Sequence, residues 1–315
     1  MCGAPNARTG LTVAVALPGA VLPGEFKIGV SKIRDVDSNG RICSLDELGV
    51  AIERAEGIWE MDTAAALGTP LAEVLGKNDT VLEVAVTPNR GDCLSHVGVA
   101  RDLAALGIGV FKQPKGVTLK EQGAVDMAVT VAGEGCPQFN LMRVRGVKNG
   151  ESPAFMRQRL EACGMRPKNV LVDVTNYVML AVGQPLHAYD ARGLDGVFKV
   201  RDALDGERFA SLLGNELVLK AGDIVIEDKA GKIIDLCGIS GGAGSAVQDD
   251  TVDVVLEAAV FERARIARTG QAHTMTTDAR YRFERGIDPD RTHEALRMCA
   301  ALIQEWGGGE VSAMV

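Results

Sequence analysis

Short apolar runs separated by glycine, proline and asparagine fill residues 1–75. Segments such as LTVAVALPG and FKIGVSKIRDVDSNGRICS have the length and punctuation of strands joined by tight turns. Many short strands of this kind are typical of small barrels. The pattern therefore predicts a small β-barrel in this first region.

Residues 76–115 change to a pattern of one strand and one helix. TVLEVAVTPNRGD reads as a strand. Ser95 can cap the helix that follows, and Gly107 can end it. The apolar stripe of this helix would be Val99, Leu103 and Leu106. The sequence FKQPKG after it is a plausible linker.

Residues 116–315 form the longest region and mix both periodicities. Strands are predicted at NLMRVRGV, VFKVR, ELVLK, DIVIED, KIIDLCGI and VDVVLEAAVF. A helix is predicted with Ser152 as its N-cap and Pro153 as its first residue, and a second over 290–306. The second carries an apolar stripe of Leu296, Cys299, Ala300 and Ile303. The predicted fold class is α+β, with a barrel, a small α/β linker module and a strand-rich mixed domain.

Composition agrees with a globular protein rich in turns. Of 315 residues, 46% are hydrophobic and 24% are charged, as in ordinary globular proteins. The 37 glycines and the low aromatic content of 4% favour small β elements over a helical bundle. The longest apolar stretch, LTVAVALPGAVLPG, is broken by proline and glycine and is shorter than the roughly 20 residues of a membrane span. No charged leader precedes it, so a cytoplasmic location is expected.

Charge and cysteine spacing exclude several classes of function. A net charge of −8 argues against a surface that binds a phosphate backbone everywhere, so any contact with nucleic acid should be local. The seven cysteines are scattered without a CxxC pair, which argues against a disulfide framework or a zinc site. HExxH is absent, so zinc hydrolysis of that type is not indicated.

Two features of the strand-rich region have both an ordinary and a functional interpretation. In GISGGAGSAVQ, residues 238–248, a tight hairpin is favoured over a ligand cradle. Glu257 lies within the otherwise apolar VDVVLEAAVF, where a carboxylate must be paired, hydrogen-bonded or shifted in pKa. A strand end that faces water and a functional carboxylate are both compatible with this position.

Residues 175–190, TNYVMLAVGQPLHAYD, place Thr175 and Asn176 before a Gly-Gln-Pro break and His187 after it. This segment is compatible with a strand–turn–strand connection that holds a structural histidine, and also with one wall of a pocket. TTDARYRFERGIDPDR, residues 276–291, is typical of a solvated turn with ion pairs. From residue types alone, the threonine, asparagine, histidine, glycine and glutamate could converge on one site.

Four stretches give these residues a common context. TPNRGDCLSHVGVARDLAAL, VDVTNYVMLAVGQPLHAYD, GISGGAGSAV followed by TVDVVLEAAVF, and TTDARYRFERGIDP resemble, in order and spacing, the β subunit of bacterial phenylalanyl-tRNA synthetase. The resemblance covers nearly all of the chain but only an internal portion of that subunit. It implies a truncated tRNA-binding OB-fold over 1–75, a small module that lacks its N-terminal part over 76–115, and the family's editing domain over 116–315.

The family's editing domain hydrolyses tyrosine wrongly attached to phenylalanine tRNA. The two amino acids differ by one hydroxyl, which a hydrophobic pocket rejects by only about 10²-fold, whereas a hydrogen-bonding site selects it far more strongly. By match to the family's motif, Glu257 is the group that accepts the tyrosine hydroxyl. A phenylalanyl ester would leave this carboxylate without its partner.

The resemblance also implies the remaining pocket residues. They are Thr175, Asn176 and His187 around the ester and its attacking water, Gly238 and Gly241 near the tyrosyl group, and Thr277 and Ala279 as small residues that keep the pocket open. Ester hydrolysis needs a positioned water and donors to the oxyanion, so no fixed nucleophile is required. His187 or a terminal ribose hydroxyl of the tRNA would place the water.

Partners and cofactors follow from the same resemblance. The complete enzyme is a tetramer of two α and two β subunits that ligates phenylalanine to its tRNA, with ATP and magnesium bound outside this region. Phenylalanine tRNA and the α subunit are the expected partners, and no cofactor or metal is expected in the fragment itself. The alternative function is a non-catalytic tRNA-binding or scaffolding segment that is inactive in isolation.

Three positions depart from the family's usual residues. Arg280 stands in place of serine and would make the pocket rim more basic. Arg41 stands in place of methionine, and Cys237 in place of alanine before Gly238. None of the three removes a pocket residue that the resemblance implies.

Overall fold

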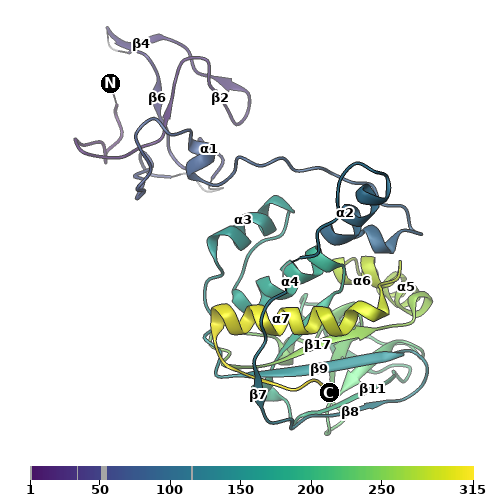
Figure 1. Cartoon of the computed structure of the whole chain (residues 1–315). Coiled ribbons are helices and arrows are strands. Elements are labelled where there is room, and N and C mark those ends of the chain that lie inside the picture. The colour runs from purple at the N-terminus through teal and green to yellow at the C-terminus, as the bar shows by residue number, and fades with distance from the viewer. Residues whose placement is uncertain (1, 34, 51–54, 115) are drawn as a thin grey trace. The chain divides into compact units, whose positions relative to one another are not determined.

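The computed structural model describes residues 2–33, 35–50, 55–114 and 116–315 and forms two compact units, Met1–Thr80 and Val81–Val315 (Figure 1). The first unit contains β1 (Val15–Ala16), β2 (Val21–Leu22), β3 (Phe26–Lys27), β4 (Ser31–Ile33), β5 (Val36–Ser38), β6 (Arg41–Ile42) and α1 (Leu71–Val74). The strands pair as three separate ladders, β1 with β6, β2 with β3 and β4 with β5. A small core of Ala16, Leu22, Ile28 and Cys43 lies among them.

The predicted β character of this unit is confirmed, but the described strands do not close a barrel. Each strand is only two or three residues long. Gly19 and Gly24, both with positive φ, lie in the turns before and after β2. The OB-fold detail remains a prediction.

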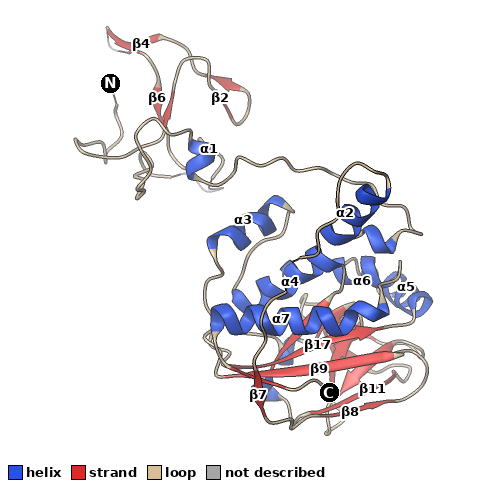
Figure 2. Cartoon of the chain, in the orientation of Figure 1, coloured by secondary structure: helices blue, strands red, loops and turns tan. Residues whose placement is uncertain are grey.

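The second unit is built on two five-stranded sheets with an apolar core between them (Figure 2). The first sheet has the order β10 (Leu186–Asp190), β17 (Asp253–Val260), β9 (Gln138–Arg145), β18 (Glu310–Ser312) and β7 (Glu121–Gly123). The second has the order β16 (Ser240–Gly241), β15 (Ile233–Leu236), β14 (Ile224–Glu227), β11 (Val197–Asp202) and β8 (Ala128–Val131). A separate ladder pairs β12 (Arg208–Ala210) with β13 (Glu216–Val218).

Helices cover the outer face of the first sheet (Figure 2). They are α3 (Ala154–Ala162), α4 (Val170–Val182) and α7 (Thr292–Gly307), while α5 (Arg263–Ala272) and α6 (Asp278–Phe283) contribute to the core between the sheets. Single 3₁₀ turns lie at Gly91–Cys93, Ala191–Gly193, Ala243–Ser245 and Pro289–Arg291. In the described part of the chain, no helix is both long and apolar enough to cross a membrane.

Strand β17 is buried on both faces, which explains its nearly continuous apolar sequence. Val254, Leu256 and Ala258 pack against the helices. Val255 and Ala259 face the other sheet. Because side chains alternate along a strand, Glu257 also projects between the two sheets.

Most of the elements predicted in 116–315 are confirmed. Strands occur at all six predicted segments, as β9, β11, β13, β14, β15 and β17. The predicted C-terminal helix is α7, and all four residues of its stripe are buried. Helix α3 starts one residue later than expected, with Pro153 as its N-cap, because the Ser152 hydroxyl donates to the Asp173 carboxylate instead.

Two predictions for 76–115 are wrong. No strand is described at residues 80–88, where Val81, Leu82 and Val84 lie exposed. Helix α2 (His96–Ala105) does form, with the Ser95 hydroxyl accepting from the Gly98 amide, but Leu103 and Leu106 are exposed.

The contacts of α2 explain why that stripe stays exposed. The helix meets the rest of the unit through its first turn, where His96 Nδ1 lies 3.0 Å from the Leu180 carbonyl of α4. Val97 and Gly98 are the residues it buries. The three-part division of the chain remains a prediction.

Candidate functional site

His187 and Glu257 face each other across neighbouring strands. In the register of β10 and β17, His187 pairs directly with Glu257. Directly opposite residues place their side chains on the same face of a sheet. Glu257 retains only 6% of its surface, in the middle of an eight-residue strand, so the interpretation as a strand end facing water is wrong.

The partner of the Glu257 carboxyl is a second residue of β10. The hydroxyl of Tyr189 donates a hydrogen bond to Oε2 of Glu257. Tyr189 is fully buried, and the His187 ring packs against it edge-on with 4.4 Å between ring centroids. The sequence did not identify Tyr189, because an aromatic residue in a strand usually indicates core packing.

A second carboxyl approaches from the opposite sheet. Asp235 of β15 is 5% exposed, and its Oδ2 lies 3.8 Å from His187 Nε2, which is too long for a hydrogen bond. This Nε2 is buried and has no hydrogen-bond partner among the described residues. Asp235 was also missed, although KIIDLCGI carries the same signal that singled out Glu257, a carboxylate in an apolar strand.

Burial has the largest effect on the pKa values of Glu257, Asp235 and His187. Burial raises the pKa of Glu257 to about 7, although the hydrogen bond from Tyr189 acts in the opposite direction. Burial and the charge of Glu257 raise the pKa of Asp235 well above its usual range, against a hydrogen bond with Tyr189. Burial lowers the pKa of His187 to about 4. At neutral pH the imidazole is therefore uncharged and Glu257 is close to its midpoint, while burial favours the protonated form of Asp235.

The glycine-rich segment forms the predicted hairpin and also adjoins the histidine. β15 and β16 pair Asp235 with Gly241, and the turn contains Gly238 at φ +69°. A Cβ at Gly238 would lie 3.1 Å from both Ile266 and Phe283, so this glycine faces the core. A Cβ at Gly241 would lie 2.5 Å from His187 Nε2. Gly241 thus leaves room for the imidazole.

Thr277 and Ala279 lie at the start of α6, next to the same hairpin. The Thr277 hydroxyl accepts from the Arg280 amide and donates to the Ile239 carbonyl, each at 3.1 Å. Ala279 packs against the core between the sheets. Arg280 turns to Glu284, at 3.0 Å, so its charge is paired within α6.

Thr175 and Asn176 lie on a different element. The segment TNYVMLAV belongs to α4, which Asn169 caps and which ends at Gly183 with φ +86°, so the strand–turn–strand interpretation is wrong. The Thr175 hydroxyl donates to the Val172 carbonyl of its own helix at 2.7 Å. Within the described residues, no hydrogen bond joins either residue to His187 or Glu257.

Gln184 anchors the turn that leads from α4 to His187. Its Nε2 donates to the Ala259 carbonyl of β17 at 3.1 Å, two residues beyond Glu257. Its Oε1 accepts from Thr292 of α7 at 3.1 Å. The residue is almost fully buried. Gln184 therefore fixes the start of β10 against the strand that carries Glu257.

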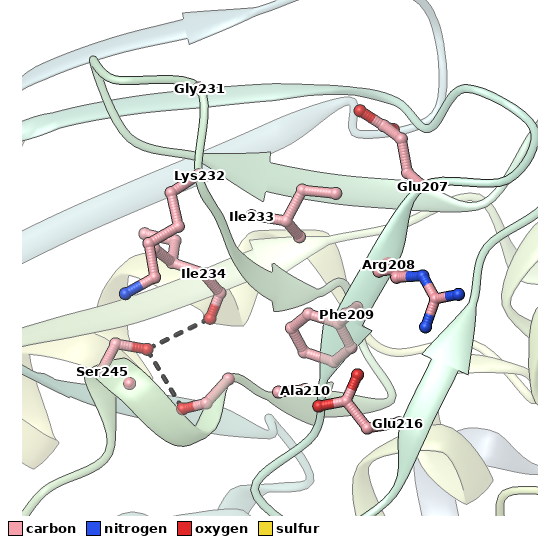
Figure 3. A pocket seen from close by; sticks show the side chains of 12 residues that line it. Glu207, Arg208, Phe209, Ala210, Glu216, Gly231, Lys232, Ile233, Ile234 and Ser245 are labelled. Atoms are coloured by element: carbon pink, nitrogen blue, oxygen red, sulfur yellow. Dashed lines mark hydrogen bonds between the residues drawn. The ribbon is translucent and has the colours of Figure 1, made fainter.

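A cavity of about 460 Å³ lies behind Gly242, the residue after Gly241 (Figure 3). Phe209, Arg208 and Glu216 line it from β12 and β13, and Lys232 and Ile234 from the β15 side. Ser245 also lines the cavity, and its hydroxyl donates to the Ile234 carbonyl at 3.1 Å. None of the predicted site residues lines this cavity.

The first unit holds a larger cavity of about 1110 Å³, which includes Arg41 in its lining. Arg41 pairs with Glu47, and its guanidinium lies 5.7 Å from the centre of the Phe26 ring. The third departure, Cys237, is buried, and burial together with the neighbouring Asp235 and Glu257 carboxyls raises its thiol pKa well above the usual range.

Comparison with known proteins places these residues in one domain family. The family model described as the B3/4 domain matches residues 135–308, more than half of the chain. The chain belongs to the B3/4 domain family. The matched range contains every predicted site residue, from Thr175 to Ala279, and also Tyr189 and Asp235.

Curated relatives extend the similarity beyond the B3/4 domain. The phenylalanine–tRNA ligase beta subunit of Novosphingobium aromaticivorans is 47% identical over 317 residues, covering 100% of this chain and 39% of that protein. The corresponding subunits of Bdellovibrio bacteriovorus and Brucella melitensis are 45% and 42% identical, covering 99% and 100% of this chain and 39% of each protein. The resemblance to this subunit is thereby confirmed, and the chain spans about two fifths of the length of these relatives.

A solved structure is also similar. It is an N-terminal fragment of the phenylalanyl-tRNA synthetase beta subunit from Pyrococcus horikoshii, with a TM-score of 0.44 and 17% identity. The match covers 74% of this chain and 65% of that one.

Proposed function

We propose that the B3/4 domain of this chain hydrolyses the ester that joins tyrosine to phenylalanine tRNA. One observation carries the proposal: a buried carboxyl, Glu257, lies directly opposite His187 across two strands and has a hydroxyl rather than a cation as its partner. A carboxylate in an apolar wall is a strong acceptor for a phenol. It is a poor neighbour for a phenyl ring, which offers it no donor.

His187 is suited to help the attacking water. Its imidazole is neutral at physiological pH because burial lowers its pKa to about 4. A neutral ring nitrogen without a partner can accept a proton from water as the water attacks the ester carbonyl. The bond between the carbonyl carbon and the ribose oxygen then breaks, and the ribose oxygen takes up a proton. No covalent intermediate on the protein is needed.

The wider setting is part of the proposal. As a portion of a phenylalanine–tRNA ligase β subunit, the chain would act in the cytoplasm with an α subunit in a tetramer of two α and two β subunits. ATP and magnesium would bind elsewhere in that enzyme. Residues 1–75 would belong to a tRNA-binding OB-fold, 76–115 to a small module and 116–315 to the editing domain.

A deacylation assay with tyrosyl- and phenylalanyl-tRNA(Phe) tests the proposal. We expect the chain to release tyrosine at least about tenfold faster than phenylalanine, because the site pairs with the phenol. Glu257→Ala should remove this preference. Glu151→Ala, which removes an exposed glutamate of the same domain, is the matched control and should keep it.

Two results would contradict the proposal. One is equal hydrolysis of both esters by the unmodified chain, and the other is an unchanged preference in Glu257→Ala. Binding of tRNA with no release of either amino acid would instead favour the non-catalytic scaffold.

A further inference from the structure

Tyr189 and Asp235 are buried polar residues beside Glu257 that the hydrolytic mechanism above does not use. Tyr189 and Asp235 have 0% and 5% of their surface exposed. They come from different sheets, Tyr189 from β10 and Asp235 from β15. A buried phenol and a buried carboxyl are both costly unless they are hydrogen-bonded, so their position next to Glu257 needs a physical account.

The surroundings of Glu257 contain no ion-pairing cation. Among the described residues, no lysine or arginine forms an ion pair with Glu257 or Asp235. The titratable side chains around these two carboxyls are His187, Tyr189, Cys136 and Cys237. Burial opposes the charged form of both carboxyls, and the charge of Glu257 raises the pKa of Asp235, so the ionisation of one disfavours the ionisation of the other. A proton on one of the two is therefore favoured.

The hydrogen bonds indicate which carboxyl keeps it. Tyr189 donates its single hydroxyl hydrogen to Glu257 Oε2. Its single hydrogen is then used, so Tyr189 cannot at the same time donate to Asp235. The bond from Tyr189 to Glu257 therefore favours the negative charge on Glu257 over Asp235.

We propose that Tyr189 is a positioning residue for Glu257: its hydroxyl holds the carboxyl ionised and oriented through Oε2, so that Oε1 accepts the phenol of a tyrosyl ester. The inference rests on the proposed editing function. Specificity for tyrosine then depends on two side chains. Glu257 contacts the ligand, and the buried Tyr189 holds Glu257 in position. A purely structural Tyr189 would affect stability and leave the titration of Glu257 unchanged.

The first test follows the ionisation of Glu257 directly, without any ligand. Carboxyl ¹³C NMR of the chain labelled at glutamate, assigned with Glu257→Gln, gives the midpoint of Glu257. In Tyr189→Phe we expect this midpoint to rise by about one to two pH units, because a hydrogen bond to the charged form is lost. Tyr177→Phe is the matched control, since it removes a hydroxyl that contacts Arg159 outside the site, and it should leave the midpoint unchanged.

The second test measures the preference for a tyrosyl over a phenylalanyl ligand. Calorimetry measures binding of 3′-deoxy-3′-(L-tyrosylamino)adenosine and its phenylalanyl counterpart, which carry a stable amide in place of the ester. The unmodified chain should prefer the tyrosyl compound at pH 7.5. Tyr189→Phe should lose most of this preference at pH 7.5 and regain it near pH 9, where Glu257 is again ionised. Tyr177→Phe should behave like the unmodified chain.

A double variant keeps the test decisive if Tyr189→Phe does not fold. Tyr189→Phe combined with Asp235→Ala removes both buried polar groups beside Glu257, so that no Asp235 carboxyl is left facing the new phenyl ring, and Glu257 still loses its donor. The midpoint of Glu257 should again rise. An unchanged midpoint in a folded variant, or a preference lost equally at all pH values, would overturn the role of Tyr189. A shifted midpoint in a chain that never prefers the tyrosyl compound would overturn the editing function and the specificity role that rests on it.

Discussion

Two buried glutamates of the same unit have opposite electrostatic surroundings. Glu227, on β14, accepts hydrogen bonds from Lys199 at 2.8 Å and from Arg201, both on the neighbouring β11. Burial alone would raise the pKa of Glu227, yet these two cations together hold it below its usual value. Glu257 has a phenol as its partner, and burial raises its pKa to about 7.

This difference separates a structural carboxylate from a responsive one. Glu227 is neutralised by its own sheet, and a ligand could add little to it. The ionised form of Glu257 is only partly stabilised by its surroundings, so a further hydrogen-bond donor from a ligand lowers its free energy strongly. Perturbed carboxyls of this kind are typical of functional sites. Glu227 was not singled out from the sequence, where it lies next to Asp228 at the end of a strand.

The largest effect on stability should come from breaking the Glu227 site. Arg201→Met leaves Glu227 and Glu207 without their shared partner, and removal of one member of a buried pair costs about 3 to 5 kcal/mol. Urea denaturation measures this loss. Arg157→Met, at a more exposed pair with Glu151, should cost less than about 1 kcal/mol. Equal losses of unfolding free energy in the two variants would mean that the ion pairs of Glu227 stabilise the fold no more than an exposed pair does.

The next effect is a pH dependence of opposite sign at the two glutamates. The folded pKa of Glu257 lies above its ordinary value of 4.5, so its ionisation opposes folding as the pH rises from about 4.5 to about 7. Glu257→Gln should therefore gain about 3 kcal/mol relative to the unmodified chain over that range and keep the gain above it.

Glu227→Gln should behave in the reverse way. The folded pKa of Glu227 is lowered, so its stabilising contribution is present above about pH 4.5 and is lost as the pH falls through the folded pKa. Unfolding free energies of both variants between pH 3 and pH 8 test the signs. A common sign for the two variants would contradict the comparison.

The smallest effect concerns the space beside the Glu257 site. Gly241→Ala places a methyl group against the His187 ring and should cost about 1 to 3 kcal/mol and slow tyrosine release about tenfold. Gly244→Ala is the matched control in the same loop, because its methyl group meets only the flexible end of Lys232. Equal rates in the two variants would show that the position of the imidazole does not matter for hydrolysis.

The sequence predicted local elements better than their pairing. The apolar run of β17 and the apolar stripe of α7 located these two elements, because both signals are local. The strand predicted at 80–88 failed because its apolar side chains have no partner strand in the described chain. Helix α4 was not predicted, since its β-branched and apolar residues also suit a strand.

The site was predictable only in part for a related reason. Glu257 stood out as a carboxylate among apolar residues, and the family resemblance supplied His187. The pairing of β10 with β17, which joins segments about 70 residues apart, determines that these two side chains meet. Tyr189 and Asp235 become visible as site residues only once that pairing and the opposing sheet bring them to the same carboxyl.

The most direct test of the central claim is the pH dependence of discrimination by the unmodified chain. The ratio of tyrosine to phenylalanine release from tRNA(Phe) should be measured from pH 5.5 to pH 8.5, with uncatalysed hydrolysis subtracted. If ionised Glu257 selects the phenol, the ratio rises with pH around a midpoint near 7 and stays low throughout in Glu257→Ala. A ratio that is independent of pH, or one that survives in Glu257→Ala, would contradict the account.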